Sequence, residues 1–287
     1  MVELKSYAKI NLGLEVIGKR DDGYHDLKTI FQTIDFFDIL YLRENTINTI
    51  RLRGDNKHIG WWKQNTIYKA FKTIYNNYNI SQGFDVSIKK NIPPGSGLGG
   101  GSSNAAVILL FLNEWFNLKI SLTELIEMGI AIGADVPFFF LGGTVLGEGI
   151  GEKMTKIIDL DETGIGIVIP GISVSTRLIF SRFRLTTEQF ESKIDIFLKS
   201  GNRKILENYL ESITFQLFPD IKRIKDKMQT YGSELVLMSG SGSAIFCTVE
   251  NCSINRIKKD FPDLVLTRTI NAEYYQNSVG AWPSGKA

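Results

Sequence analysis

The residues of this chain that could do chemistry gather first in a glycine-rich loop, Asn91-Ile-Pro-Pro-Gly-Ser-Gly-Leu-Gly-Gly-Gly-Ser-Ser-Asn104. The loop separates a segment typical of a strand from an apolar segment typical of a helix. Its glycines let the backbone adopt positive φ and let a ligand come close to the N–H groups. The helix that follows offers unpaired N–H donors and the positive end of its dipole. The loop therefore predicts a phosphate site.

Two commoner phosphate-binding patterns fit this loop poorly. The Walker pattern requires a lysine where Gly101 stands. The Rossmann pattern is spelled by Gly95, Gly97 and Gly100, but it should close the first strand of a βαβ unit, and about ninety residues precede it here. A glycine loop without any ligand is the remaining alternative, and Pro93-Pro94 beside the triple glycine argues against it.

Two further pairs of residues suggest a binding pocket. Lys9 and Asn11 are two residues apart on a predicted strand, so both side chains lie on one face. They indicate a polar pocket, with a solvated strand face as the alternative. Tyr24 and His25 stand at a predicted turn, where they would either stack on a flat ligand or form a half-buried turn with the imidazole bonded to backbone.

Asp135 is a carboxylate at an element boundary, just before three phenylalanines. Carboxylates in such places are usually helix caps, and a role beside a bound phosphate is the alternative. A second glycine-serine turn, residues 238–244, lies between apolar strands and is either an anion nest or a tight hairpin. The two histidines, His25 and His58, do not stand at metal-ligand spacing from another ligand, so we expect no histidine metal site.

Composition places the chain among ordinary globular proteins. Its 287 residues, 43% of them hydrophobic, suffice for two medium domains. A net charge of only +2 argues against nucleic acid or an anionic membrane as a partner. The two cysteines, Cys247 and Cys252, cannot build a disulfide framework, which favours a reducing compartment. Without a signal peptide or an apolar stretch of roughly 18 residues, we expect a cytoplasmic protein.

The elements that must position these residues alternate between strands and helices. Before a boundary near residues 159–164, periodicity predicts strands over 4–17, 28–43 and 83–90, and helices over 65–78, 102–116 and 121–132. After it we expect strands over 165–169 and 264–270, a strand-turn-strand over 238–249, and helices over 187–198, 204–213, 220–231 and 254–261. This order predicts an α+β protein with domains 1–160 and 161–276, and a tail, 277–287, that is disordered or left from expression.

Taken in order, these motifs resemble those of the GHMP small-molecule kinases. A-K-I-N near the start, the glycine loop, G-A-D-V-P and S-G-S-G-S follow the layout of that family. The spellings D-G-Y-H, G-G-G-S-S-N and P-G-x-x-x-S-T, the last at Pro170 to Thr176, are similar to the branch whose substrate is 4-diphosphocytidyl-2-C-methyl-D-erythritol. The resemblance runs from about residue 5 to residue 249.

The resemblance implies a fold and an activity. The N-terminal, ATP-binding domain is expected to be like domain 2 of ribosomal protein S5, and the C-terminal domain ferredoxin-like, with the site between them. The expected reaction transfers the γ-phosphoryl group of ATP, with Mg²⁺, to the 2-hydroxyl of that small-molecule substrate in the non-mevalonate isoprenoid pathway. The protein would be a monomer or a homodimer, without nucleic-acid or membrane partners.

The resemblance also implies roles for particular residues. Asp135 matches the catalytic base and Lys9 the lysine that pairs with it. The matched substrate contacts are Asn11, Tyr24, His25, Phe31, Thr176 and Phe180. The matched ATP contacts are Pro93, Pro94, Gly95, Ser96, Gly97, Leu98, Gly99, Gly100, Gly101, Ser102 and Ser103. The third motif, Gly240, Ser241 and Gly242, is expected near the phosphates, and only Ser102 or Ser103 is a candidate for a metal contact.

Two rival functions remain at this point. Another GHMP kinase would act on mevalonate, homoserine or a sugar, but the aromatic set of Tyr24, His25 and Phe180 argues against it because those substrates carry no base to stack. A non-catalytic RNA-binding module is the rival from another class, since S5-like domains also occur in RNA-binding proteins. The near-neutral charge, without basic runs beside aromatic residues, argues against RNA.

Overall fold

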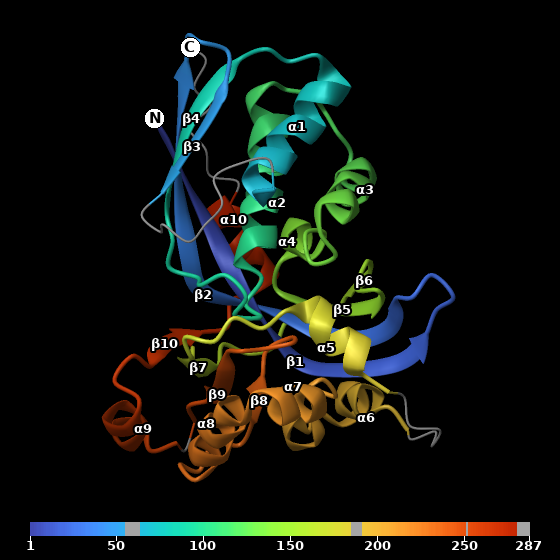
Figure 1. The fold of residues 1–287 in the computed structure, drawn as a ribbon, viewed down its shortest axis with the longest axis vertical. Coiled ribbons are helices and arrows are strands. Elements are labelled where there is room, and N and C mark those ends of the chain that lie inside the picture. Colours follow the sequence, from blue (N-terminus) through green and yellow to red (C-terminus); the bar gives the residue numbers. More distant parts are fainter. Residues whose placement is uncertain (55–63, 185–190, 251, 280–287) are drawn as a thin grey trace.

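The computed structural model of the chain describes residues 1–54, 64–184, 191–250 and 252–279. Its first sheet is built on two long strands, β1 (Val2–Lys19) and β2 (His25–Asn45), which pair antiparallel along most of their length (Figure 1). The other edge of β2 pairs with β5 (Thr144–Gly149) and then with β4 (Gly83–Lys89). The outer strands of this sheet are β3 (Ile50–Gly54) and β6 (Lys153–Lys156). The predicted strands over 4–17, 28–43 and 83–90 are confirmed.

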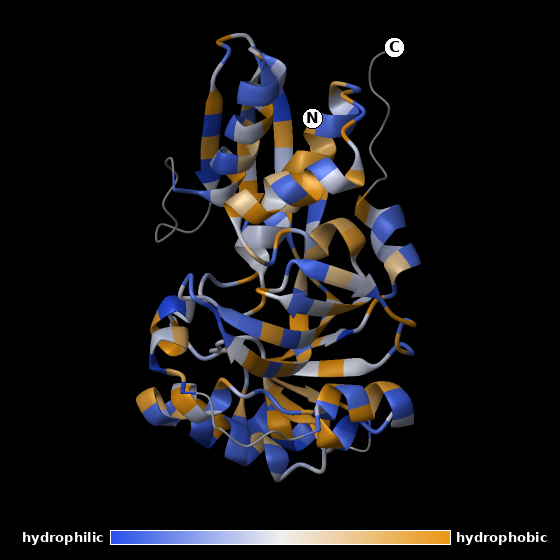
Figure 2. Ribbon diagram, turned by 90° about the vertical axis from the view of Figure 1, so that its right-hand side faces the viewer, coloured by the Kyte–Doolittle hydropathy of each residue, from blue (hydrophilic) through white to orange (hydrophobic). Residues whose placement is uncertain are grey.

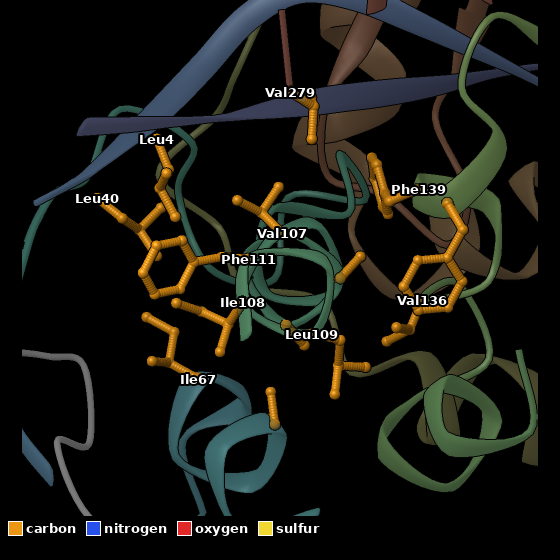
Figure 3. Close-up of a cluster of buried hydrophobic side chains, with 14 of the residues drawn as sticks. Leu4, Leu40, Ile67, Val107, Ile108, Leu109, Phe111, Val136, Phe139 and Val279 are labelled. Atoms are coloured by element: carbon orange, nitrogen blue, oxygen red, sulfur yellow. The ribbon is translucent and has the colours of Figure 1, made fainter. Parts of the chain in front are cut away.

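Helices cover one face of the first sheet. These are α1 (Thr66–Tyr78), α2 (Gly100–Trp115), α3 (Leu122–Ile132) and the short α4 (Phe138–Leu141). The predicted starts of α1 and α3 are confirmed, because Asn65 accepts a hydrogen bond from the Ile67 amide, and Ser121 with Glu124 forms a capping box. Side chains of α2 lie at the centre of the buried cluster in Figure 3, so we call this cluster the first core.

The second sheet is ferredoxin-like. Its strands are β7 (Gly164–Val168), β8 (Val236–Met238), β9 (Ile245–Thr248) and β10 (Val265–Arg268), in the order β10-β7-β9-β8. The helices between them are α5 (Thr176–Arg182), α6 (Lys193–Ser200), α7 (Glu211–Leu217), α8 (Pro219–Gln229) and α9 (Ile254–Asp260). In Figure 2 the helices at the lower end carry both hydrophilic and hydrophobic residues, as helices do when one face packs on a sheet. The expected α+β class is confirmed.

The last helix, α10 (Ala272–Val279), returns to the first sheet. In Figure 1 it lies beside α2, among elements from the other end of the chain. Tyr275 and Val279 are buried in the first core. Residues 277–279 were predicted to belong to the tail, and this is wrong, because the apolar face of α10 packs into that core. Residues 280–287 lie outside the described residues.

Two helices of the second unit differ from their prediction. Over 204–213 the chain forms a 3₁₀ turn, Arg203–Ile205, then an extended stretch, and α7 begins only at Glu211. The stretch is extended because it pairs with β1: the Leu14 amide donates to Glu207, and the Tyr209 amide donates to Leu14. The helix predicted over 187–198 is α6, which begins at Lys193, and its predicted first residues lie outside the described part of the chain.

None of the helices in the described ranges combines the length and the apolar character that a membrane crossing requires.

A buried ion pair fixes the chain where β4 leads into the glycine loop. Asp38, on β2, is fully buried and pairs with Lys90, which is 6% exposed. The second oxygen of the same carboxylate accepts hydrogen bonds from the amides of Asn91 and Ile92, both at 2.8 Å. Asp38 therefore orients the first residues of the loop.

We predict that Asp38→Asn lowers the free energy of unfolding by roughly 3 to 5 kcal/mol, because it removes a buried negative charge beside a buried lysine. Urea unfolding of the purified variant measures the loss. Asp226→Asn is the control, because its pair with Lys222 is half exposed and such pairs contribute less than about 1 kcal/mol. Equal losses of unfolding free energy in the two variants would contradict the conclusion that the Asp38 ion pair stabilises the start of the loop.

Candidate active site

A cavity of about 330 Å³ opens where β1, the glycine loop and the second unit meet. The predicted residues that it brings together are Lys9, Asn11, Phe31, Asp135, Thr176, Phe180, Gly240, Ser241 and the loop ranges 93–97 and 99–102. They come from segments far apart in the chain, and no local element could have joined them. Most of the predicted site therefore lies around one cavity.

Five predicted residues do not line this cavity. The Leu98 side chain is fully buried, and its carbonyl accepts from the Lys9 amide at 3.0 Å. Ser103 is also buried, and its hydroxyl accepts from that of Ser6 at 2.8 Å. These two residues support the loop from behind. The others are Tyr24, His25 and Gly242.

Lys9 and Asp135 face each other across the cavity. Lys9 Nζ lies 3.6 Å from Asp135 Oδ2, and it donates to Asn11 Oδ1 at 2.6 Å. Lys9 is 3% exposed and Asp135 36% exposed, so the carboxylate is the member of the pair that incoming molecules can reach. Burial lowers the pKa of the Lys9 ammonium, and the Asp135 carboxylate opposes that shift.

The capping alternative for Asp135 does not fit this geometry. Asp135 lies in the turn between α3 and α4, and neither helix takes it as its cap residue. Within the described part of the chain, the interaction of its carboxylate is the ion pair with Lys9. The side chain is thus available to accept a proton or a hydrogen bond from a ligand.

A relay of hydrogen bonds holds Lys9 and Asn11 in place. Asn11 Nδ2 donates to Thr29 Oγ1 at 2.8 Å, and that hydroxyl donates to the Gly13 carbonyl at 2.7 Å. Thr29 lines the cavity but was not predicted. It stands two residues before Phe31 on β2, so the strand period that places Phe31 at the site could have indicated Thr29 as well.

The glycine loop presents backbone to the cavity. Gly95, Gly97 and Gly99 have φ of 69°, 80° and 73°, which residues with a Cβ rarely adopt. Gly99 caps α2 without a side-chain hydrogen bond, and the first amides of a helix have no acceptor within it. These amides, with the positive end of the helix dipole, can hold a phosphate.

The third motif packs directly on this loop. A Cβ on Gly97 would lie 2.1 Å from the Ser239 carbonyl, and the Ser239 hydroxyl donates to the Gly97 carbonyl at 2.9 Å. Asn208 holds the third motif from the other side, because its amide group donates to the carbonyls of Met238 and Gly240, both at 2.7 Å. Asn208 had no sequence signal, since it was predicted to lie within a helix.

Aromatic rings gather where Phe180 lines the cavity. The rings of His25 and Phe180 are 5.5 Å apart and tilted by 32°, and Phe180 lines the cavity. Burial lowers the pKa of His25, and the charge of Lys19 lowers it further, so the imidazole is neutral near pH 7 and can both donate and accept. Tyr24 is 60% exposed beside it. Thr176 joins this end to the third motif through a 2.8 Å bond between its hydroxyl and that of Ser241.

Across the described ranges, no three histidine, cysteine, aspartate or glutamate side chains group as a metal site. Magnesium in phosphoryl-transfer sites is usually held by one or two protein groups together with the phosphates. Ser102 fits such a contact because it lines the cavity at the start of α2. Ser103 fits less well because of its bond to Ser6.

Two family models match the chain. Residues 65–143 match the GHMP kinases N terminal domain, and residues 195–261 match GHMP kinases C terminal. The chain is 39% identical to a 4-diphosphocytidyl-2-C-methyl-D-erythritol kinase of Clostridium beijerinckii, over 94% of this chain and 100% of that protein. It is 38% identical to the protein of the same name from Caldicellulosiruptor saccharolyticus, over 96% and 99%.

Solved structures agree with these sequence matches. The crystal structure of a 4-(cytidine 5'-diphospho)-2C-methyl-D-erythritol kinase matches with a TM-score of 0.78 and 30% identity, over 93% of this chain and 98% of that one. A mevalonate kinase matches with a TM-score of 0.69 and 16% identity, over 94% and 100%. The second likeness shows the fold alone.

We predict that Gly101→Val raises the Kd for a non-hydrolysable ATP analogue about tenfold or more, equal to at least 1.4 kcal/mol, while the fold is kept. A Cβ on Gly101 meets only Thr66, at 3.5 Å, and Gly101 lines the cavity in the first turn of α2, so a branched side chain there should crowd phosphates held by the amides. Isothermal titration with a non-hydrolysable ATP analogue and with a cytidine diphosphate ligand measures the two ends of the cavity separately.

Gly97→Ala should behave differently. Gly97 has a positive φ, and a Cβ there would clash with Ser239, so we expect this variant to fold poorly and to bind both ligands less tightly. Gly171→Ala is the neutral control, since a Cβ there meets nothing within 4 Å. Unchanged affinity for the ATP analogue in Gly101→Val would show that the loop does not cradle ATP.

Proposed function

The chain belongs to the 4-diphosphocytidyl-2-C-methyl-D-erythritol kinases of the GHMP family, and from this membership we propose its reaction and the roles of its residues. It transfers the γ-phosphoryl group of ATP to the 2-hydroxyl of 4-diphosphocytidyl-2-C-methyl-D-erythritol, a step of the non-mevalonate isoprenoid pathway. One observation carries the assignment of roles: the Lys9–Asp135 pair and the glycine loop face the same cavity.

Asp135 is the proposed general base. Phosphoryl transfer asks a protein mainly for in-line positioning and for stabilisation of charge, with a carboxylate to accept the proton of the attacking hydroxyl. Asp135 is the exposed member of its pair, so it can reach that hydroxyl. Lys9 holds the carboxylate by charge and supplies a buried positive charge close to the phosphoryl group that moves.

The glycine loop and the third motif are proposed to bind the phosphates of ATP. Amides of Gly100, Gly101 and Ser102 at the start of α2 are the donors, and Gly240 closes the opposite side. Ser102 would hold Mg²⁺ together with the phosphates. When bound, the metal neutralises charge on the phosphate oxygens.

The aromatic end of the cavity is proposed to bind the cytosine base. Phe180 and Tyr24 would take the two faces of the ring, and the neutral His25 would bond to its polar edge. Mevalonate and homoserine have no base to place there, and the kinases for them are similar to this chain at only 16% to 17% identity. Asn11, Phe31 and Thr176 line the cavity between the two ends and are proposed to contact the substrate.

A cytoplasmic location, a monomeric or homodimeric state, and domains spanning 1–160 and 161–276 stay predictions from the sequence.

The reaction is tested by following ADP release from ATP and Mg²⁺ with 4-diphosphocytidyl-2-C-methyl-D-erythritol as acceptor. Mevalonate and homoserine are tested as acceptors in the same assay. If one of them is phosphorylated and 4-diphosphocytidyl-2-C-methyl-D-erythritol is not, the proposed substrate is wrong. In this assay we predict that Asp135→Asn lowers kcat by roughly 10² or more, the usual effect of losing a general base.

The shape of the site survives in Asp135→Asn, so both KM values should stay within a few fold. Circular dichroism and thermal unfolding check that the variant is folded. If it keeps more than about a third of the wild-type kcat, Asp135 is not the base and catalysis rests on positioning alone.

We predict that Phe180→Ala raises the KM for the cytidine substrate and leaves the KM for ATP unchanged. A base stacked on an aromatic ring contributes about 1 to 3 kcal/mol, and Phe180 lies beside His25, the other residue proposed to bind the base. Steady-state kinetics with each substrate varied in turn separates the two constants. Equal damage to both would make Phe180 a packing residue.

A further inference from the structure

The short helix α4 ends in carbonyl groups that its own backbone cannot satisfy. The last four carbonyls of an α-helix have no donor within the helix, and α4 has only four residues. The Gly142 amide donates to Phe138 at 2.9 Å. The other three carbonyls are buried at the boundary with α10, where an unpaired carbonyl is costly.

Two neighbouring side chains of α10 satisfy these three carbonyls. The Tyr275 hydroxyl donates to the Phe139 carbonyl at 2.5 Å. Gln276 Nε2 donates to the carbonyls of Phe140 and Leu141, at 2.9 and 2.8 Å. The Tyr275 ring also lies directly on Gly142, where an added Cβ would be 2.1 Å from Cδ1. Two side chains of α10 therefore bond to the carbonyls that remain free at the C-terminal end of α4.

The turn that carries Asp135 is continuous with α4. The Val136 amide donates to Gly133 at 3.0 Å, and the Phe139 amide donates to Val136 at 3.1 Å, so this turn and the helix form one hydrogen-bonded unit. The Phe139 ring reaches the site itself, because a Cβ on Gly99 would lie 2.9 Å from Phe139 Cζ and 3.0 Å from Lys9 Cγ. A shift of α4 would thus move Asp135 and the Phe139 ring relative to Lys9, which is held on β1.

α10 is itself fixed to the first sheet. Asp159 accepts from the Ala272 amide at 3.0 Å and from the Thr144 amide at 2.8 Å, which ties the first turn of α10 to the start of β5. Val279 lies in the first core with Phe139 and Val107 of α2 (Figure 3). These contacts fix α10 to the first sheet and to the first core, so α10 can hold α4 in place.

We propose that Tyr275 and Gln276 are positioning residues for the phosphoryl transfer, acting through α4 to set the distance between Asp135 and Lys9. This rests on the proposed function. Neither residue lines the cavity, and both follow the stretch that matches the GHMP C-terminal model, residues 195–261. They act on the turnover step because they hold the base, and they leave the binding of either substrate alone.

The decisive variant is Gln276→Met, which keeps the length of the side chain and removes both donors. We expect kcat to fall about 10- to 100-fold, the scale of a small misplacement of reacting groups, while both KM values stay within a few fold. Hydrogen exchange without nucleotide should show faster exchange in a peptide spanning residues 133–143. Tyr275→Phe, which keeps the ring and loses one donor, should show a smaller loss of the same kind.

Tyr7→Phe is the matched control. The Tyr7 ring packs 5.7 Å from that of Tyr275, and its buried hydroxyl lies near Ser278 and Tyr274 of α10 without the geometry of a hydrogen bond to any residue in the described part of the chain. Its removal should change neither kcat nor exchange. If Gln276→Met does not fold, the same measurements on Tyr275→Phe decide.

The results separate this inference from the proposed function. A folded Gln276→Met with wild-type kcat would overturn it, and so would faster exchange spread evenly over the protein, even though the wild type turns over its substrate. If the wild type shows no turnover, the proposed function fails. The exchange of residues 133–143 then still shows whether α10 holds the Asp135 turn.

Discussion

The structure is organised around one buried charge, the ammonium of Lys9. A lysine on β1 with almost no exposure is stable as a cation only where oxygen atoms surround it. One of these oxygens comes from Asn11 on the same strand, and the other from Asp135, more than a hundred residues later. The turn before α4 must therefore lie against β1, and this requirement places α4 beside the start of α2. The glycine loop then enters the same corner, because its Leu98 carbonyl accepts from the Lys9 amide.

The corner leaves no space for a side chain at Gly97 or Gly99. At Gly97 the loop lies backbone to backbone on the third motif, and at Gly99 it lies against Phe139 and Lys9. These close contacts hold the loop in one conformation. In that conformation the loop does not cover the amides at the start of α2. Glycine is needed at these positions because it has no side chain and allows positive φ, and not because the loop must be flexible. The neighbouring residues hold its backbone on both sides.

What the sequence predicts and what it misses follow the range of the interactions. Asn65 and the Ser121–Glu124 box marked helix starts correctly because a cap is satisfied within a few residues. Lys9 and Asp135 could be predicted as site residues from the family motifs in which they stand, and in the structure they form an ion pair. The extended stretch at Asn208 could not be foreseen. The side-chain amide of Asn208 donates to carbonyls about thirty residues later, and the backbone of its neighbours Glu207 and Tyr209 is hydrogen-bonded to Leu14 of β1. Thr29 was missed although its position relative to Phe31 carried the signal.

The role of α10 was hidden for a related reason. Its residues 272–279 show only a modest apolar pattern, and the donors that matter, Tyr275 and Gln276, look like any polar residues near a chain end. Their value comes from acceptors about 135 residues earlier, at the end of a helix too short to be stable by itself. Each hydrogen bond contributes only about 1 kcal/mol to folding. A small shift of a general base can cost more than that in rate, because a proton transfer tolerates little change in distance. Such contacts can therefore matter more to turnover than to the stability of the fold.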